Sequence, residues 1–403
     1  MAMTASSRAA QGVGSEQSER SPFARLAELL APYQPGKPLI TLSLGEPQHP
    51  VPGFVGPVLA QHIGDFGRYP IARGIEPFRR AAANWLSRRF RLPRPLDPER
   101  EVLVLNGSRE GLFLAAIAAV RHVGRRGRPA ILMPNPFYPA YAAGARAADC
   151  EAIFLPTTRA NGFLPDLDPL DEATLARTVA VYIASPANPQ GAVASKEYFG
   201  KLRQLAARFG FMILSDECYS EIYTRAAPGS MLECAGTDFS QVVAFQSLSK
   251  RSNLPGLRVG FAAGDRQFLQ RFHELRNVAA PQVPVPLQQV AVAAYGDEAH
   301  VEENRRLYRV KFDLADQILG SRYGYERPAG GFCVWLDVSQ HGGDEAATVK
   351  LYRDGGVRVI PGSYLARQQA DGSNSGAGYI RLALVADSET TAEALHRLVN
   401  ILE

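Results

Sequence analysis

The 403-residue sequence has few cysteines, and their arrangement excludes two common stabilising devices. Cys150, Cys218, Cys234 and Cys333 are widely spaced and show neither a paired nor a metal-ligand pattern. The seven histidines also lack the spacing of a zinc site. We therefore expect free thiols, a reducing cytoplasmic environment and no bound metal.

A strong excess of one charge is also missing. The 44 lysines and arginines nearly balance the 40 acidic residues, which leaves a net charge of +4. The densest basic stretch, residues 121–128, contains glycines and is typical of a solvated helix end and loop. The first sixty residues show no helix-turn-helix pattern with a basic face. We therefore expect no nucleic-acid partner.

Long apolar runs are absent as well. The longest, residues 112–120, is far too short to span a membrane, and no apolar stretch of signal-peptide length occurs near the start. We therefore expect no membrane partner, and the polar composition of residues 1–20 predicts a mobile arm. With 46% hydrophobic residues, the chain is long enough for one large and one smaller domain.

The middle of the chain alternates apolar, strand-like segments with helical patterns. The strand-like segments are residues 102–105, 130–133, 179–184, 211–214, 242–245 and 258–264. This alternation predicts an α/β fold with a mostly parallel sheet and helices on both faces. We assign residues 66–296 to this large domain, and residues 21–65 and 297–403 to a smaller α+β domain.

One lysine follows the apolar segment from Val242 to Phe245. Such a segment must be buried, so it places Ser247, Ser249 and Lys250 in a polar turn at the carboxyl end of a strand. Ligands bind at that edge in open α/β sheets. A lysine partly removed from water there loses its charge more readily and can bond to an aldehyde cofactor. From this segment alone, a solvated loop lysine is the alternative.

The same segment also fits the Ser-x-x-Lys pattern of penicillin-recognising enzymes. Those enzymes also need a Lys-Thr-Gly, which does not occur, and a Ser-Asp-Asn, where this chain has Ser215 to Glu217. Pro255 and Gly256 would interrupt a long helix that starts at the serine. The sequence therefore disfavours this chemistry.

Polar residues follow other predicted strands. Gly107 and Ser108 lie between a strand and a helix, which is an anion-binding arrangement but more often only a cap. Asn188 stands between two prolines, and Tyr138 lies in a proline-rich loop where it can stack on a flat ring or pack in the core. Asp216 directly follows four apolar residues, so burying it requires a cationic partner unless it only caps a helix.

These residues, in this order, resemble the class I/II aminotransferases of the aspartate aminotransferase fold. The spacings from Asn188 to Asp216, from Asp216 to Tyr219 and from Lys250 to Arg258 match the family, and the resemblance covers nearly the whole chain. It implies the PLP-dependent fold type I with a seven-stranded, mostly parallel sheet. It also implies pyridoxal 5'-phosphate as cofactor and ping-pong transfer between amino acids and 2-oxo acids.

The resemblance implies a role for each residue. Lys250 would bond to the cofactor and later move the substrate proton, while Asp216 would pair with the protonated pyridine nitrogen. Tyr219 and Asn188 would bind the ring oxygen, and Tyr138 would stack on the ring. The phosphate would be held by Gly107, Ser108 and Arg109 through their backbone, and by Ser247, Ser249 and Arg258.

Further roles concern the substrate and a second subunit. By resemblance, Arg381 would grip the substrate α-carboxylate, although an exposed strand arginine is the alternative from the sequence alone. Gly45 and Asn188 would also contact the substrate. Tyr69 would reach the phosphate in the neighbouring subunit's site, which implies a homodimer with shared active sites.

Finer matches point to a subgroup. The segments Leu44 to Pro50, Asn135 to Tyr138, Ser215 to Tyr223, Ser247 to Arg258 and Pro361 to Arg367 are similar to succinyldiaminopimelate transaminases of the lysine and peptidoglycan pathway. Residues 277–284 depart from that subgroup near the substrate mouth. A transaminase for aspartate, alanine or aromatic amino acids therefore stays open, as does a PLP-dependent β-lyase. A ligand-sensing regulator would need a DNA-binding module that the sequence does not show.

Overall fold

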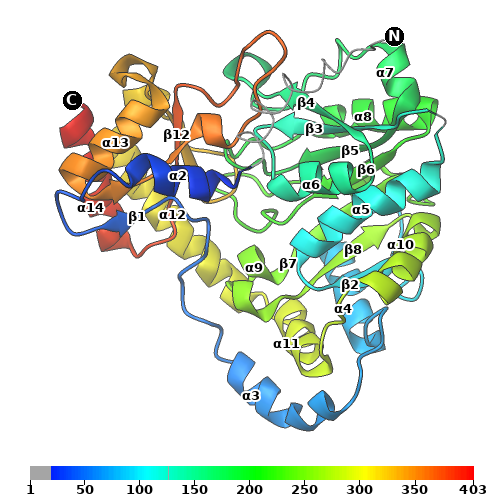
Figure 1. The fold of residues 1–403 in the computed structure, drawn as a ribbon. Helices are drawn as coiled ribbons and strands as arrows, with labels where there is room; N and C mark the ends of the chain where they lie inside the picture. Colours follow the sequence, from blue (N-terminus) through cyan, green and yellow to red (C-terminus); the bar gives the residue numbers. More distant parts are fainter. Residues whose placement is uncertain (1–19, 126) are drawn as a thin grey trace, which may run out of the picture.

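The computed structural model describes residues 20–125 and 127–403 (Figure 1). The arm expected at residues 1–20 therefore lies outside the described residues, except for Arg20. In the described ranges, no helix is both long and apolar enough to cross a membrane. Over the same ranges, no group of three or more His, Cys, Asp or Glu side chains is arranged to hold a metal ion.

Seven strands form the larger sheet, in the order β2-β8-β7-β6-β5-β3-β4. They are β2 (Val102–Leu105), β3 (Ala130–Asn135), β4 (Glu151–Pro156), β5 (Thr178–Ala184), β6 (Met212–Asp216), β7 (Val242–Ser247) and β8 (Gly260–Gly264). Strand β8 runs antiparallel to both of its neighbours, and the other pairs are parallel. The predicted α/β fold with a mostly parallel sheet is confirmed.

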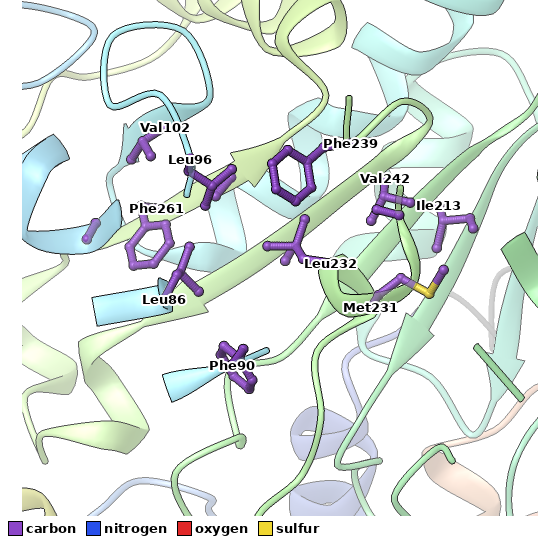
Figure 2. Close-up of a cluster of buried hydrophobic side chains, with 14 of the residues drawn as sticks. Leu86, Phe90, Leu96, Val102, Ile213, Met231, Leu232, Phe239, Val242 and Phe261 are labelled. Carbon is purple, nitrogen blue, oxygen red and sulfur yellow. The ribbon is translucent and has the colours of Figure 1, made fainter. Parts of the chain in front are cut away.

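Each face of this sheet carries its own apolar cluster, because successive strand residues point to opposite sides. On one face, Val102, Ile213, Val242 and Phe261 from the strands belong to the cluster drawn in Figure 2, in which Leu86 lies near Phe261. The helices that cover this face are α4 (Glu76–Arg89), α8 (Lys196–Phe209) and α11 (Val285–Gly296). The opposite face is covered by α5 (Ser108–Val123), α6 (Pro139–Ala147) and α10 (Arg266–Ala279). The sheet is thus buried on both sides, and its strand ends are left for a ligand.

The smaller part of the fold combines both ends of the described chain. Strands β9 (Cys333–Asp337), β11 (Ile360–Pro361) and β12 (Tyr379–Ala383) form an antiparallel sheet, and β1 (Ile40–Thr41) pairs in parallel with β10 (Val357–Arg358). The helices here are α2 (Pro22–Leu30), α13 (Gly343–Gly355) and α14 (Ser388–Leu402), joined to the larger sheet by α12 (Ala299–Leu319) (Figure 1). Strands β10 and β11 are separated by one residue and belong to different sheets.

Other short elements complete the chain. They are α3 (Val55–Gln61), α7 (Glu172–Arg177), α9 (Leu248–Arg251), η1 (Ile63–Gly67), η2 (Arg159–Asn161), η3 (Met231–Cys234), η4 (Pro255–Leu257), η5 (Arg322–Gly324), η6 (Ser339–His341) and η7 (Gly362–Tyr364). Helix α3 packs against α11, with Val55, Val58 and Leu59 on the apolar cluster of the larger sheet. The expected domain boundaries near residues 65 and 297 stay a prediction.

Candidate active site

Lys250 lies just beyond the carboxyl end of β7. The predicted polar turn is instead the short helix α9, because the Ser247 hydroxyl accepts a hydrogen bond from the Ser249 N–H (3.2 Å) and caps it. The Lys250 ammonium donates to the carbonyl oxygen of Gly45 and lies 5.0 Å from the ring centre of Phe332. The loop that contains Gly45 therefore meets the end of β7 at this lysine.

The surroundings of Lys250 make its amine more reactive. Burial is the main cause that lowers the pKa of Lys250 to about 8, and the Arg381 cation acts in the same direction. Cys333, Cys218 and Glu46 oppose this shift. Because the neutral amine is the nucleophile, a pKa near 8 gives a useful fraction of it at neutral pH.

Asp216 ends the neighbouring strand β6, where the residue is half-buried. The Tyr141 hydroxyl donates to Asp216 Oδ2 (2.6 Å), and the Cys218 N–H donates to Oδ1 (3.2 Å). Burial raises the pKa of Asp216, while these two donors and the more distant Lys250 oppose the rise. Both hydrogen-bond donors are neutral and leave the carboxylate available to a cationic ligand. The expected pairing of Asp216 with a protonated ring nitrogen stays a prediction.

Tyr219 and Asn188 lie side by side near the lysine. Asn188 Nδ2 donates to the Tyr219 hydroxyl oxygen (3.5 Å), and the Tyr219 ring meets Phe332 edge-on at 5.2 Å. The Cys333 thiol contacts Asn188 Oδ1 at 3.9 Å. Burial, the largest cause, raises the pKa of the Tyr219 phenol well above its usual value. The two side chains thus present a neutral hydroxyl and an amide to the same space.

An anion cup lies at the start of α5. Gly107 adopts φ +75° and directly precedes the helix, whose first N–H groups are free. A Cβ on Gly107 would lie 2.1 Å from Arg258 Nη2, so a side chain here would displace the guanidinium from its present position. Ser108 and Ser247 both approach Gly260 closely, because glycine has no side chain. A Cβ added to Gly260 would lie 3.4 Å from Ser108 N and 3.5 Å from Ser247 Cα. Helix N–H groups, a guanidinium and a hydroxyl fit a phosphate.

Arg381 enters the site from β12. Its side chain is buried, Nη2 donates to the Ser43 carbonyl oxygen, and Nε has no hydrogen-bond partner in the described part of the chain. A buried guanidinium with an unused donor favours an anionic ligand, such as a carboxylate. The charge of Arg381 helps to lower the pKa of Lys250, so the two cations lie near each other.

The remaining predicted residues differ in their placement. The half-buried Tyr138 accepts a hydrogen bond from Arg109 Nε (2.7 Å), so the Arg109 side chain reaches Tyr138, while the phosphate contact expected of its backbone stays a prediction. Ser249 accepts a hydrogen bond from the Ser247 hydroxyl (3.0 Å). Tyr69 is fully exposed and is not brought to the other site residues within this chain.

Sequence reasoning missed several neighbours. Tyr141, Cys218, Phe332 and Cys333 all contact or electrostatically influence the predicted residues. Tyr141 had a usable signal, because it lies three residues after Tyr138 at the start of a helix and so shares its face. Cys218 also had a local signal, because it lies between Asp216 and Tyr219 and its N–H bonds to Asp216 two residues away. Phe332 and Cys333 had none, since their positions depend on long-range packing.

A desolvated lysine, a carboxylate and a cup of anion-binding groups at strand ends are groups that fit a phosphorylated aldehyde with a basic ring nitrogen. The sequence profile of the family "Aminotransferase class I and II" matches residues 37–398. The chain therefore belongs to the class I and II aminotransferases, and the predicted resemblance is confirmed. This family uses pyridoxal phosphate, so the predicted cofactor is confirmed as well.

Individual relatives agree with this assignment. The chain is 33% identical to the LL-diaminopimelate aminotransferase of Desulforudis audaxviator, over 93% of this chain and 94% of that protein. An aminotransferase structure from Neisseria meningitidis has a TM-score of 0.90 and 36% identity, and covers 98% of this chain and 100% of its own. A Thermus thermophilus protein described as a probable N-succinyldiaminopimelate aminotransferase has a TM-score of 0.83 and 27% identity, with 94% and 100% coverage.

Proposed function

We propose that this aminotransferase acts on a diaminopimelate-type substrate, with N-succinyl-L,L-diaminopimelate and 2-oxoglutarate as the leading pair. The similarity of five sequence segments to succinyldiaminopimelate transaminases and the likeness to the Thermus thermophilus protein support this substrate. The enzyme would work in lysine or diaminopimelate biosynthesis by two ping-pong half-reactions.

One observation carries the proposal of amino-group transfer. Lys250, with a pKa of about 8, and Arg381, with a buried Nε that is unused in the described ranges, are close enough for the Arg381 charge to lower the pKa of Lys250. Both also donate to one loop, at the Gly45 and Ser43 carbonyl oxygens. Arg381 would bind the α-carboxylate as a fork, which orients the Cα–H bond toward Lys250. The neutral Lys250 amine would then take the proton from Cα.

The other predicted residues would hold the cofactor. When bound, pyridoxal phosphate supplies a ring that accepts the electron pair left at Cα. Asp216 would pair with the protonated ring nitrogen, and the Tyr138 ring would stack on the ring face. The Tyr219 hydroxyl and the Asn188 amide would bind the ring oxygen. The phosphate would be bound by Gly107, Ser108, Arg109, Ser247, Ser249 and Arg258.

A second candidate substrate is free LL-diaminopimelate. Relatives between 29% and 33% identical, each aligned over at least 90% of this chain, carry the name LL-diaminopimelate aminotransferase. The two substrates differ at the end far from the reacting carbon. LL-diaminopimelate carries a free ammonium there, whereas the succinyl group replaces it with an amide and an added carboxylate. A site that pairs the charge at the far end of one substrate would leave the different charge of the other substrate unpaired. It should therefore bind that other substrate more weakly.

An acceptor screen separates these candidates. The purified enzyme is first converted with glutamate to its aminated form and then offered single 2-oxo acids. We expect N-succinyl-2-amino-6-oxopimelate to convert the aminated enzyme back to its aldehyde form faster than the other 2-oxo acids do. Preference for the unacylated 2-oxo acid would support the second candidate, and preference for oxaloacetate, pyruvate or aromatic 2-oxo acids would overturn both. Release of pyruvate and ammonia without an acceptor would indicate a β-lyase.

We also propose a homodimer with shared active sites. Several large apolar side chains between residues 44 and 71 are exposed in the single chain: Leu44, Val51, Ile63, Phe66, Tyr69 and Ile71. Exposed apolar residues concentrated in one segment are typical of an interface. Tyr69 would bind the phosphate held by the partner subunit. We further propose a cytoplasmic location, because all four cysteines are free.

A subunit-mixing experiment tests the dimer. Tyr69→Ala and Lys250→Ala homodimers should each be nearly inactive, because each lacks one part of every site. A mixed dimer contains one site with both residues intact. We therefore expect activity to return after the two variants are unfolded together and refolded. A lack of recovery from mixtures that are shown to be dimeric would contradict shared sites.

A further inference from the structure

A chain of hydrogen bonds runs from the long helix α12 to the backbone of Lys250. On α12, Asn304, Tyr308 and Lys311 lie on one face, since they are four and three residues apart. Lys311 is 1% exposed. Its Nζ lies 2.7 Å from His49 Nε2, and it donates to the carbonyl oxygens of Leu384 (3.1 Å) and Val385 (3.2 Å).

The direction of each hydrogen bond in this chain is determined. Asn304 Nδ2 donates to the carbonyl oxygens of Lys250 (3.1 Å) and Arg251 (3.3 Å), so Oδ1 is its acceptor atom. His49 Nδ1, 2.7 Å from that Oδ1, must therefore carry the proton. This leaves His49 Nε2 as an acceptor for the Lys311 ammonium. Burial lowers the pKa of His49, which agrees with a neutral ring.

The same chain joins three segments that meet at the site. His49 belongs to the loop in which Ser43 accepts from Arg381 and Gly45 accepts from Lys250. The Leu384 carbonyl, bound by Lys311, lies three residues after Arg381. Asn304 binds the backbone of Lys250 itself. A second clamp fixes the loop, because Asn253 Nδ2 donates to the His49 and Pro50 carbonyl oxygens.

We propose that Lys311, His49 and Asn304 are positioning residues that set the separation between Arg381 and Lys250. This inference rests on the roles proposed above for those two residues. A buried ammonium is costly, and apolar packing alone would hold a helix more cheaply. The network instead ties the carboxylate-binding strand, the loop over the lysine and the lysine backbone to one helix face. A substrate held at Arg381 is thereby presented to Lys250 at a fixed distance.

Lys311→Met tests the proposal, since methionine retains the apolar stem and removes the ammonium. Its matched control is Phe312→Leu, which alters the adjacent α12 residue in the apolar cluster around β9 and β12. We expect Lys311→Met to lower kcat/KM at least tenfold in both half-reactions. It should also weaken binding of 2-methylglutamate at least fivefold, measured from the absorbance of the bound cofactor. This ligand has no α-proton and reports binding without turnover.

The control separates positioning from stability. Phe312→Leu should lower the melting temperature at least as much as Lys311→Met does. It should nevertheless leave kcat/KM and 2-methylglutamate binding within twofold of the parent enzyme. If Lys311→Met also changes only the melting temperature, the proposal is wrong. If Lys311→Met does not fold, Asn304→Leu gives the same readouts, because leucine has neither the acceptor for His49 nor the donors to the Lys250 and Arg251 carbonyl oxygens.

A double variant tests whether the residues act as one unit. The double variant Lys311→Met, Asn304→Leu should have the same kcat/KM as the less active of the two single variants, because either change alone already breaks the chain of hydrogen bonds. Additive losses would overturn the proposal. A parent enzyme that transaminates no amino acid would instead reject the function on which the inference rests.

Discussion

The Tyr141 hydroxyl donates a 2.6 Å hydrogen bond to the Asp216 carboxylate, and the Tyr141 ring lies flat against Tyr182 with centres 4.3 Å apart. The Tyr182 hydroxyl in turn donates to the Leu112 carbonyl oxygen (2.5 Å) on α5. Burial raises the pKa of Asp216, and the hydrogen bond from Tyr141 is the largest influence that opposes this rise. Tyr141 therefore helps to keep the carboxylate charged and oriented.

Replacing Tyr141 by phenylalanine should reduce catalysis. The pKa of Asp216 would rise further, because a donor to the charged form is lost, and a protonated acid pairs poorly with a cationic ring nitrogen. We expect kcat to fall about tenfold. Tyr182→Phe is the control: it removes a hydroxyl from the same stack without touching Asp216, and kcat should stay within twofold. Steady-state kinetics with both variants measures the difference, and equal losses would contradict the role of Tyr141.

The capture of cofactor by the apoprotein should depend on pH in a defined direction. The pKa of Lys250 is lowered to about 8, mainly by burial, and only its neutral amine attacks an aldehyde. The neutral fraction rises as pH rises and saturates above that pKa. The capture rate should therefore increase about tenfold from pH 6 to pH 7 and level off above about pH 8. Stopped-flow absorbance measures it. A rate still rising steeply at pH 10 would indicate an ordinary solvated lysine.

Gly107→Ala should weaken cofactor binding as well as stability. Gly107 has φ +75°, and an added Cβ would lie 2.1 Å from Arg258 Nη2. Gly124→Ala provides a matched control, because Gly124 has φ +67° but, apart from its own chain neighbours, no atom of the described residues lies within 4 Å of the added Cβ. Both variants should lose about 1 kcal/mol from backbone strain. Only Gly107→Ala should also release pyridoxal phosphate at least tenfold more readily, measured by equilibrium dialysis.

Much of the fold followed from local patterns in the sequence. Buried strands such as 102–105 and 242–245 are continuous apolar runs, which is how a sheet covered on both faces appears in sequence. Strand β4 was not predicted from the sequence. It is a half-buried edge strand that begins at Glu151 and ends at Pro156, so it lacks a continuous apolar run. Helix α9 was taken for a turn, since its four residues are too few to show a period.

The site divides in the same way. Gly107, Asp216 and Lys250 could be predicted because each follows a strand, and strand ends meet at one edge of the sheet. His49 and Lys311 could not, because they are 262 residues apart and meet only through tertiary packing. Nothing local marks Lys311 as buried, since a lysine on a charged helix is normally solvated.

Arg381→Lys should separate substrate binding from chemistry. Arg381 Nη2 is already used by the Ser43 carbonyl oxygen, and its buried Nε is left without a partner in the described ranges. Lysine keeps the charge but cannot supply the planar fork that a carboxylate prefers. KM for both the amino acid and the 2-oxo acid should rise at least tenfold, with a smaller change in kcat.

Arg397→Lys is the control, because Arg397 also binds carbonyl oxygens, those of Pro38 and Gly355, within the smaller part of the fold. Its KM values should match the parent enzyme, and an unchanged KM in Arg381→Lys would remove Arg381 from the substrate site.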